Sequence, residues 1–361
     1  MFGSSNDSYP PGSDTQGSAT GGADHVVACQ PAWQREMADA VRSIDELLPL
    51  VGLKLSQLDY SDAALKSFRL RVPRGFVRRM RRGDPQDPLL LQVLPRALET
   101  ENQPGFVTDP VADLVYSKGK GVIHKYRNRI LLVTTAACAV HCRYCFRRHF
   151  PYAEQNPRGQ DKWCEVLDTL RASPEVDEVI LSGGDPLSLP DASLASLLAG
   201  LDTIPQIRSV RIHSRLPVVL PSRIDQGLLA VLRASRKKLV MVIHANHPNE
   251  LDADTDRACR QLAAIGVALF NQSVLLRGVN DDADILINLS QRLFDAGVIP
   301  YYLNLLDRVA GAAHFEVDEV SARRLVNAMR ARLAGYLVPR LVRDVPGGAG
   351  KTIIDLGACR V

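Results

Sequence analysis

The sequence predicts an α/β protein whose main domain is a partial (β/α)6 barrel of the TIM type. From Arg129 onward, six short apolar runs alternate with amphipathic helical patterns. Repeated strand-then-helix units form a parallel sheet with right-handed crossovers, and runs that are apolar throughout are typical of strands buried on both faces. Polar residues at the ends of the runs favour a barrel, because barrel strands converge at their carboxyl ends. An open doubly wound sheet is the alternative, although no GxGxxG opens the first unit.

Each element of the barrel can be placed from the sequence. The apolar runs read RILLVTTA, EVILSGG, VRIHSR, LVMVIHA, ALFNQSVLL and IPYYLNLL. Helical patterns follow them at 161–172, 191–201, 223–234, 252–265, 282–295 and 317–334. The polar residues at the carboxyl ends of the runs are Ser182, His213, His244, Gln272 and Asn304. We expect these side chains to gather at one mouth of the barrel, where functional residues lie.

The chain before the barrel divides into a tail and a helical region. Residues 1–26 are rich in Gly, Ser and Asp and are predicted to be disordered. Apolar positions recur at helical spacing over 33–53, a second segment over 68–82 begins at a turn marked by Pro73, and a polar linker is expected over 99–104. The predicted organisation is a tail over 1–26, a mainly helical region over 27–120, the partial barrel over 121–315, and a C-terminal helix with a lysine-bearing loop over 316–361.

Composition excludes several classes of protein. The chain has 361 residues, of which 46% are hydrophobic, and its formal net charge of +4 is not concentrated on one face, which argues against nucleic-acid binding. The basic run at 78–82 is interpreted as a solvated helix end. No apolar run is long enough to span a membrane and no secretory signal opens the chain, so we expect a cytoplasmic protein with no membrane partner. Cys164 and Cys259 fall in helical patterns and are expected to be buried.

Three of the seven cysteines, Cys138, Cys142 and Cys145, form a C-x3-C-x2-C loop. Three thiolates at this spacing suit an iron–sulfur cluster, and because a [4Fe–4S] cubane normally takes four cysteines, one iron would be open to a cofactor. A zinc site is the alternative reading of the loop. Structural zinc sites close with four ligands, however, and His141 adjoins Cys142, which is a poor geometry for joining the same tetrahedron.

Two glycine-rich segments are candidates for ligand contact. Ser182, Gly183, Gly184 and Asp185 follow the second strand, where the glycines let a backbone approach a ligand and the carboxylate could hold an ammonium group; the alternative is a strand-ending turn. Near the C-terminus, PGGAGKT fails as a phosphate-binding P-loop, because a valine occupies the position of the required first glycine. Lys351 on this flexible loop can instead form a Schiff base with pyridoxal phosphate (PLP), unless it is a solvated turn residue.

These motifs together carry a family resemblance. The cysteine spacing resembles that of the radical S-adenosylmethionine (SAM) superfamily, and a longer set of motifs resembles its PLP-dependent branch, the lysine 2,3-aminomutases. The set occurs in the family's order over 105–355 and reads HKYRNRILL, CAVHCRYCFRRHFPY, LSGGDPL, RIHSR, HANHPNE, NQSVLLRGVND, PYYLNLLD, GAAHF and PGGAGKT.

The resemblance implies a barrel of the radical SAM type with three cofactors: a [4Fe–4S] cluster on the three cysteines, SAM and PLP. Lys351 would carry PLP as a Schiff base, with Tyr126 as a second catalytic residue and Arg129 beside the same cofactor. The residues implied near SAM are Ser182, Gly183, Gly184, Asp185, His244 and Gln272. Asp185 departs from the family element that binds the SAM amino group, in which a glutamate stands at this position.

The resemblance also implies the substrate contacts of an isomerase that converts L-α-lysine to (R)-β-lysine. Arg147 matches the arginine that takes the substrate carboxylate, a task that suits a planar bidentate fork. Asp307 and Asp344 match two carboxylates that bind the distal ammonium group of lysine. Paired acids repel each other and raise one pKa, so a cationic side chain is a sensible partner for them.

One departure narrows the branch of the family. Stand-alone lysine 2,3-aminomutases have further cysteines that bind a structural zinc between subunits, whereas here the corresponding loop reads RGVNDDAD and the chain stops at CRV. This tail and the lead-in RVPRGFVRRMRRGDPQDPLLLQVLP resemble the EpmB branch, which supplies β-lysine for modifying elongation factor P.

That resemblance implies a functional link to elongation factor P and its lysyl ligase, and an electron donor such as flavodoxin or ferredoxin. Without the zinc elements, the sequence predicts no oligomeric state. The alternatives are a stand-alone aminomutase for lysine or another amino acid, serving catabolism or osmolyte synthesis, and a non-catalytic protein whose cysteines hold zinc.

Overall fold

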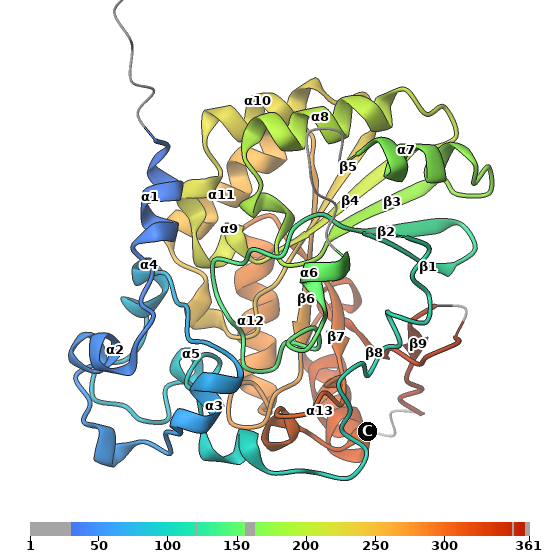
Figure 1. Ribbon diagram of the computed structural model, residues 1–361. Helices are drawn as coiled ribbons and strands as arrows, with labels where there is room; N and C mark the ends of the chain where they lie inside the picture. Colours follow the sequence, from blue (N-terminus) through green and yellow to red (C-terminus); the bar gives the residue numbers. More distant parts are fainter. Residues whose placement is uncertain (1–29, 120, 156–162, 349, 358–361) are drawn as a thin grey trace, which may run out of the picture. The chain divides into compact units, whose positions relative to one another are not determined.

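The computed structural model describes residues 30–119, 121–155, 163–348 and 350–357, so the predicted tail over 1–26 lies outside the described residues. Residues 32–361 make up one compact unit, and its described part is built on a nine-stranded sheet in the order β1 to β9 (Figure 1). Strands β2 to β8 pair in parallel, while β1 and β9 pair antiparallel at the two edges. The sheet therefore does not close on itself, as expected of a partial barrel.

The strands agree with the predicted pattern over most of the sheet. Their bounds are β1 Val122–Tyr126, β2 Arg129–Val133, β3 Glu178–Ser182, β4 Ser209–Ser214, β5 Lys238–Ile243, β6 Ala268–Val274, β7 Ile299–Asn304, β8 Arg340–Arg343 and β9 Thr352–Ile353. The six predicted apolar runs are β2 to β7. Strands β1, β8 and β9 were missed by the sequence pattern, because they are short and carry basic or exposed residues.

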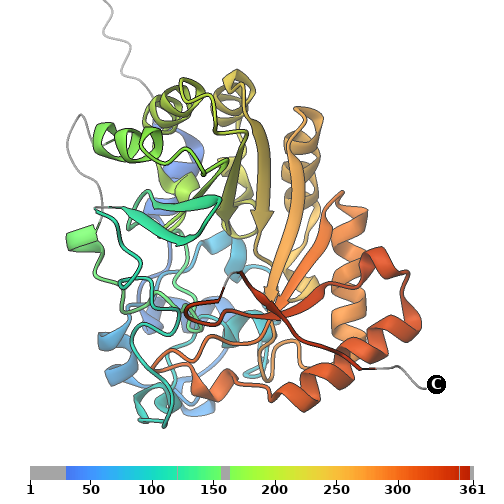
Figure 2. The same ribbon diagram turned by 90° about the vertical axis from the view of Figure 1, so that its right-hand side faces the viewer.

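Each parallel strand from β2 to β7 is followed by a helix that leads to the next parallel strand. These helices are α7 Cys164–Arg171, α8 Asp191–Asp202, α10 Gln226–Ala234, α11 Ala253–Ala264, α12 Ala283–Asp295 and α13 Glu319–Arg332. Figure 2 shows the later helices, in orange and red, flanking the strands that they connect. The prediction of an α/β fold made of six strand-then-helix units is thus confirmed.

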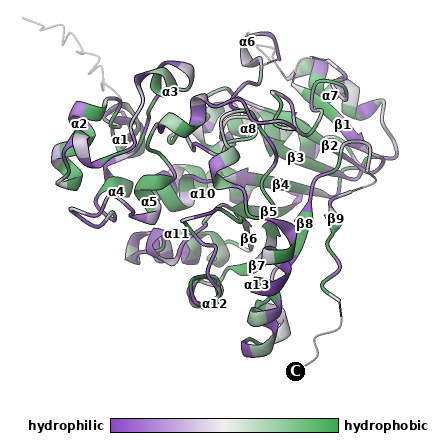
Figure 3. Ribbon diagram, turned by 90° about the horizontal axis from the view of Figure 1, so that it is seen from below, coloured by the Kyte–Doolittle hydropathy of each residue, from purple (hydrophilic) through white to green (hydrophobic). Residues whose placement is uncertain are grey.

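Local capping explains where four of these helices begin. The side chains of Asp225, Asp252, Asp282 and Asp318 accept backbone N–H groups in the first turns of α10, α11, α12 and α13. Strands β3 and β5 are largely hydrophobic and buried, while β4 alternates buried Val210 and Ile212 with polar residues (Figure 3). Burial on both faces fixes the parallel sheet as a rigid platform for the residues at its carboxyl edge.

The region before the sheet is helical and shares its core with the barrel. Its helices are α1 Ala32–Ala38, α2 Ile44–Val51, α3 Asp62–Ser67, α4 Arg74–Val77 and α5 Pro88–Leu91. The helical pattern predicted over 33–53 is interrupted between α1 and α2, where Val41 pairs with Val72 across an isolated bridge. Gly52 ends α2 with a φ of 68°, the left-handed conformation that favours glycine. Trp33 and Leu89 pack into the same hydrophobic cluster as barrel residues such as Val179.

Two sequence expectations were wrong, and a third holds in part. Glu99 is buried and paired with two arginines, so residue 99 does not belong to a polar linker. Cys164 is exposed at the start of α7, whereas Cys259 is buried as expected. In the basic run at 78–82 three of the four arginines are exposed, as expected, but Arg79 is partly buried, with its Nε 2.6 Å from Asp252 Oδ2. Glu99 and Arg79 have partners distant in sequence, which produce no local pattern.

Among the residues that the structure describes, no helix has the length and apolar character needed to cross a bilayer.

Candidate active site

A cavity of about 650 Å³ opens at the carboxyl ends of the parallel strands. It is lined by the polar residues that the sequence places at those ends: Ser182, His213, His244, Gln272 and Asn304. Every other candidate site residue also lines it: Tyr126, Arg129, Cys138, Cys142, Cys145, Arg147, Gly183, Gly184, Asp185, Asp307, Asp344 and Lys351. Residues from widely separated parts of the chain thus meet in one place.

The cysteine loop follows β2 and is braced by the helical lead-in. The backbone N–H of His141 donates to Arg71 O at 2.9 Å, and that of Arg143 donates to Gln92 O at 2.8 Å. Beneath the loop, Glu99 binds the guanidinium groups of Arg143 and Arg148 at 2.5 and 2.8 Å, with all three side chains almost completely buried. The loop is therefore held from a region that lies forty residues or more earlier in the chain.

The spacing of the three thiols matters for the kind of metal group they fit. Within the described ranges, no group of three or more His, Cys, Asp or Glu side chains lies close enough to hold a single metal ion. A cubane makes a different demand, because each thiolate binds its own iron. Cys138, Cys142 and Cys145 all face the cavity as free thiols.

The two glycines after β3 pass directly beneath the residues that lead into the cysteine loop. Gly184 N–H donates to Thr135 O at 2.7 Å, and Asp185 N–H donates to Ala137 O at 2.8 Å. Gly183 has a φ of 121°, and a Cβ atom on Gly184 would collide with the carbonyl oxygen of Ala137. Only glycine fits such a close approach of two backbones. The glycine pair therefore allows the segment that leads into the cysteine loop to pack directly on the end of β3.

Asp185 is buried and already has polar partners. Its Oδ1 accepts from Ser214 Oγ at 2.7 Å, and its Oδ2 accepts from the backbone N–H of Arg215 at 2.7 Å. Burial raises the pKa of this carboxyl to about 6, against the lowering effect of these hydrogen bonds. In this structure Asp185 joins the end of β3 to the end of β4, and its predicted contact with SAM stays a prediction.

Arg147 lies in the wall of the cavity with its own carboxylate partner. Its Nε donates to Asp113 Oδ2 at 2.7 Å and its Nη1 donates to Ser182 Oγ at 2.8 Å. Lys125 Nζ lies 2.5 Å from the other oxygen of Asp113. Although burial favours the neutral acid, the two cations hold the pKa of Asp113 below its ordinary value. Asp113 thus orients a cationic pair that faces the cavity.

The candidate lysine sits at the base of the hairpin that joins β8 to β9. Arg343 of β8 pairs with Thr352 of β9, and Asp344 and Lys351 are the next residues on the loop side of this pair. The hairpin therefore brings the two side chains together, with Lys351 Nζ 3.5 Å from Asp344 Oδ2. Burial raises the pKa of nearby Asp307 to about 6; Lys351 lowers it and the Asp344 carboxylate raises it. Two carboxylates and one amine therefore share this end of the cavity.

The hairpin between β1 and β2 places an aromatic and a cation beside the lysine loop. Tyr126 pairs with Arg129 across the hairpin, and the guanidinium carbon lies 4.4 Å from the centre of the tyrosine ring. Burial, together with the charge of Asp344, raises the pKa of Tyr126 to about 12. A Cβ atom on Gly350 would lie 3.4 Å from Arg129 Nη2, so the two segments are neighbours.

Polar atoms without partners line the middle of the cavity. In the described part of the chain, His213 Nε2, His244 Nε2 and Asn304 Oδ1 are buried and make no hydrogen bond. The two imidazoles meet edge to face at 5.7 Å between ring centres, and burial lowers the pKa of both, that of His244 to about 4. Neutral, unpaired polar groups aimed into a cavity require partners from a bound molecule. This observation fits cofactors such as SAM and PLP.

Sequence reasoning missed several residues of the site. Asp113, Lys125 and Arg215 line the cavity, and their partners are distant in sequence. His213 was expected at the strand ends but received no role. The sequence signals for Arg215 were its place as the last residue of the run VRIHSR and of the motif RIHSR.

A three-cysteine loop after the first parallel strand, a glycine pair after the second and an open α/β sheet define a protein of the radical SAM class. The model of the radical SAM superfamily accordingly matches residues 132–289. The chain is 49% identical over 325 residues to L-lysine 2,3-aminomutase of Escherichia coli, which covers 90% of this chain and 94% of the relative. It is 44% identical over 328 residues to the protein of the same name from Haemophilus influenzae, covering 91% and 97% of the two chains. With the Clostridium subterminale L-lysine 2,3-aminomutase, the identity is 35% over 320 residues, covering 89% and 77%.

The chain therefore belongs to the L-lysine 2,3-aminomutase family, a family of isomerases within the radical SAM enzymes. Membership implies a [4Fe–4S] cluster, SAM and PLP as cofactors. The cavity fits that set: three thiols lie on one wall, an amine lies on another, and unpaired polar atoms lie between them.

Proposed function

We propose that this protein is an L-lysine 2,3-aminomutase that converts L-α-lysine to (R)-β-lysine by a PLP-dependent radical SAM mechanism. The observation that carries the proposal is the shared end of the cavity, where Asp307, Asp344 and Lys351 come together. An amine on a glycine-rich hairpin suits PLP, and paired carboxylates suit a cationic side chain. Relatives under the name L-lysine 2,3-aminomutase support the same substrate.

Each group of residues has a proposed task. Cys138, Cys142 and Cys145 would hold the cluster, with SAM against Ser182, Gly183, Gly184, Asp185, His244 and Gln272; Lys351 would hold PLP, with Tyr126 and Arg129 beside it. When bound, the cluster and SAM would supply the radical that takes hydrogen from the substrate, and PLP would supply the π system through which nitrogen moves.

The protein's own residues bind and orient the substrate. Arg147 would take the lysine carboxylate, because Asp113 and Ser182 already fix its fork toward the cavity. Asp307 and Asp344 would take the distal ammonium group. The apolar side chains of Ile180, Val242 and Leu306 line the same cavity and would help to keep water from the substrate.

Product analysis tests the activity. Purified protein, reconstituted anaerobically with iron, sulfide and PLP and then reduced, is incubated with SAM and lysine, and the product is identified by chromatography. We expect β-lysine, and we expect Asp307→Asn and Asp344→Asn to raise the KM for lysine, while Asp168→Asn, at an exposed site, leaves it unchanged. Turnover of glutamate without turnover of lysine would reject the substrate, and reconstituted protein that carries zinc but no cluster would favour the non-catalytic alternative.

We further propose that the β-lysine serves the modification of elongation factor P, with a flavodoxin or ferredoxin as electron donor. The support is the lead-in over 71–95 and the RGVNDDAD loop after β6, which lacks the cysteine found in stand-alone aminomutases. Mass spectrometry of elongation factor P is the test. A strain without this protein should lose the β-lysyl group and regain it with the intact gene but not with Lys351→Ala. If elongation factor P in the deletion strain is β-lysylated as in the wild type, the stand-alone alternative is favoured.

A further inference from the structure

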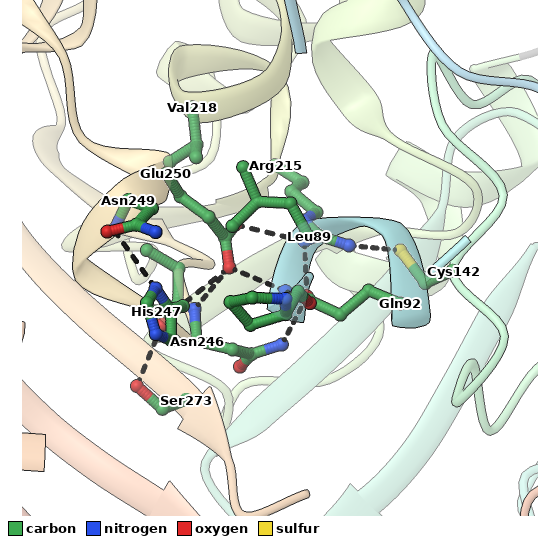
Figure 4. A network of polar contacts seen from close by, with 12 residues as sticks. Leu89, Gln92, Cys142, Arg215, Val218, Asn246, His247, Asn249, Glu250 and Ser273 are labelled. Atoms are coloured by element: carbon green, nitrogen blue, oxygen red, sulfur yellow. Dashed lines mark hydrogen bonds and ion pairs between the residues drawn. The ribbon is translucent and has the colours of Figure 1, made fainter. Parts of the chain in front are cut away.

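A network of buried polar contacts lies directly behind Cys142 (Figure 4). Arg215, the first residue after β4, donates from Nη1 to Cys142 Sγ at 2.7 Å. Its Nη2 donates to Gln92 Oε1 at 2.7 Å and to Glu250 Oε2 at 2.9 Å. The guanidinium group thus joins one thiol of the cysteine loop to a buried carboxylate.

The position of this guanidinium group is fixed by several elements of the fold. Glu250 also accepts from Gln92 Nε2 at 3.1 Å and from the backbone N–H groups of Asn246 and His247 at 2.9 and 3.1 Å. The backbone N–H of Arg215 is itself held by Asp185 at 2.7 Å. The Arg215 and Glu250 side chains are 6% and 0% exposed, so water screens their charges very little.

A cation that donates a hydrogen bond to a cluster thiolate affects the electron transfer step. One-electron reduction adds a negative charge that spreads onto the sulfur ligands. A guanidinium N–H at that sulfur stabilises the reduced cluster more than the oxidised one, and hydrogen bonds to the sulfurs are among the features that set cluster potentials. The Glu250 carboxylate acts in the opposite direction, because it offsets part of the Arg215 charge.

We propose that Arg215 is a positioning residue that raises the reduction potential of the cluster through its hydrogen bond to Cys142, and that Glu250 sets the size of this effect. The inference rests on the proposed function, since it requires a cluster on the cysteine loop. The side-chain hydrogen bonds of Arg215 go to Cys142, Gln92 and Glu250, so it acts through the thiol of the cysteine loop. Its role is to make the cluster easier to reduce in the electron transfer that starts the reaction.

A purely structural role for the pair is the competing explanation, and a matched arginine separates the two. Arg223 is fully buried and has an acidic partner, Asp191, at 2.7 Å. Its hydrogen bonds go to the carbonyl oxygens of Leu187 and Leu189 at 2.7 and 3.2 Å, and no cysteine is among these partners. Substitution of Arg223 therefore removes a buried cation of the same kind without touching the cluster.

The experiment is an anaerobic redox titration of the reconstituted full-length protein, followed by electron paramagnetic resonance, with iron and sulfide counted for each variant. At the midpoint potential of the wild type, we expect the ratio of reduced to oxidised cluster in Arg215→Met to be about tenfold lower. A change of this size corresponds to the free energy of about one hydrogen bond to a charged group. Arg215→Lys keeps the charge and should show a smaller fall. Glu250→Gln should move the ratio in the opposite direction, and Arg223→Met should leave it unchanged.

Each outcome decides the proposal. An unchanged midpoint in Arg215→Met with full iron content would overturn it, and so would loss of the cluster from both Arg215 variants, because Arg215 would then be structural. Shifts of the same sign in Arg215→Met and Glu250→Gln would also contradict it. A wild-type protein that assembles no cluster would instead reject the proposed function, which is thereby tested separately.

Discussion

The two ends of the cavity are built in opposite ways. At the cluster end, the buried glutamates are paired with arginines: Glu99 binds two arginines, and Glu250 binds Arg215. At the lysine end, Lys351 makes one contact of 3.5 Å, on a hairpin whose second strand has two residues. The comparison suggests that the cluster end is preorganised and that the lysine end keeps the freedom to exchange partners during turnover.

The largest expected effect is the loss of stability on replacing Glu99 at the cluster end. Glu99→Ala leaves Arg143 and Arg148 buried without their anion, and breaking such a pair typically costs about 3–5 kcal/mol. We expect the protein to lose that much of its free energy of unfolding, measured by denaturant titration, and to bind less iron. Glu101→Ala, at a neighbouring exposed site, is the control and should change neither quantity.

A pair of glycine substitutions compares the two ends directly. Gly184→Ala drives a Cβ atom into the carbonyl of Ala137, and overpacking of this kind costs about 1–3 kcal/mol. Gly350→Ala meets only Arg129 Nη2 at 3.4 Å, and we expect a change within about 0.5 kcal/mol. Thermal unfolding of both variants measures this difference. Equal losses would mean that the lysine end is as rigid as the cluster end.

Lys351→Ala should separate stability from function. Because Lys351 is partly exposed and makes a single long ion pair, its loss should change the free energy of unfolding by at most about 1 kcal/mol. Lysine turnover and the visible absorbance of bound PLP should both disappear. Lys118→Ala, at an exposed lysine, should retain both. PLP absorbance that survives in Lys351→Ala would assign the Schiff base to another lysine.

The smallest expected effect is a dependence on pH at the lysine end. The pKa of Asp307 is raised to about 6, so below that pH the carboxyl is neutral and binds the lysine ammonium group less well. We expect the KM for lysine to rise as pH falls through about 6. In Asp344→Asn the midpoint should move to lower pH, because the Asp344 charge raises the Asp307 pKa. A midpoint that does not move would show that the two carboxyls are not coupled.

The raised pKa of Asp307 also predicts how the stability of the protein depends on pH. A carboxyl whose pKa is higher in the folded than in the unfolded state favours folding when protonated, so its contribution is lost as pH rises from about 4 to 6. The free energy of unfolding of Asp307→Asn should therefore vary less with pH over that window than that of the wild type.

The sequence predicts well those parts of the site that depend on local spacing. Cys138, Gly184 and Lys351 are recognisable because thiolate spacing, close backbone approach and a flexible loop each leave a pattern within a few residues. The strand ends are predictable for the same reason, since parallel strands buried on both faces are continuously apolar.

What the sequence does not predict are the partners that hold these residues. Asp113 lies 34 residues before Arg147, and Glu250 lies 35 residues after Arg215, with no periodicity to connect them. Glu99 lies in a polar stretch that is typical of a loop, and only the tertiary structure shows that two arginines surround it. Strand β8 escapes prediction because two of its four residues are exposed arginines.

The most direct test of the central claim, that one cavity moves an amino group within lysine, uses lysine with a heavy-nitrogen label on its α-amino group. Nuclear magnetic resonance of the product should show the label on the β carbon, without dilution by unlabelled ammonia in the buffer. Cys142→Ala and Lys351→Ala should give no labelled β-lysine. A product whose β nitrogen is unlabelled, or activity that persists in either variant, would contradict the claim.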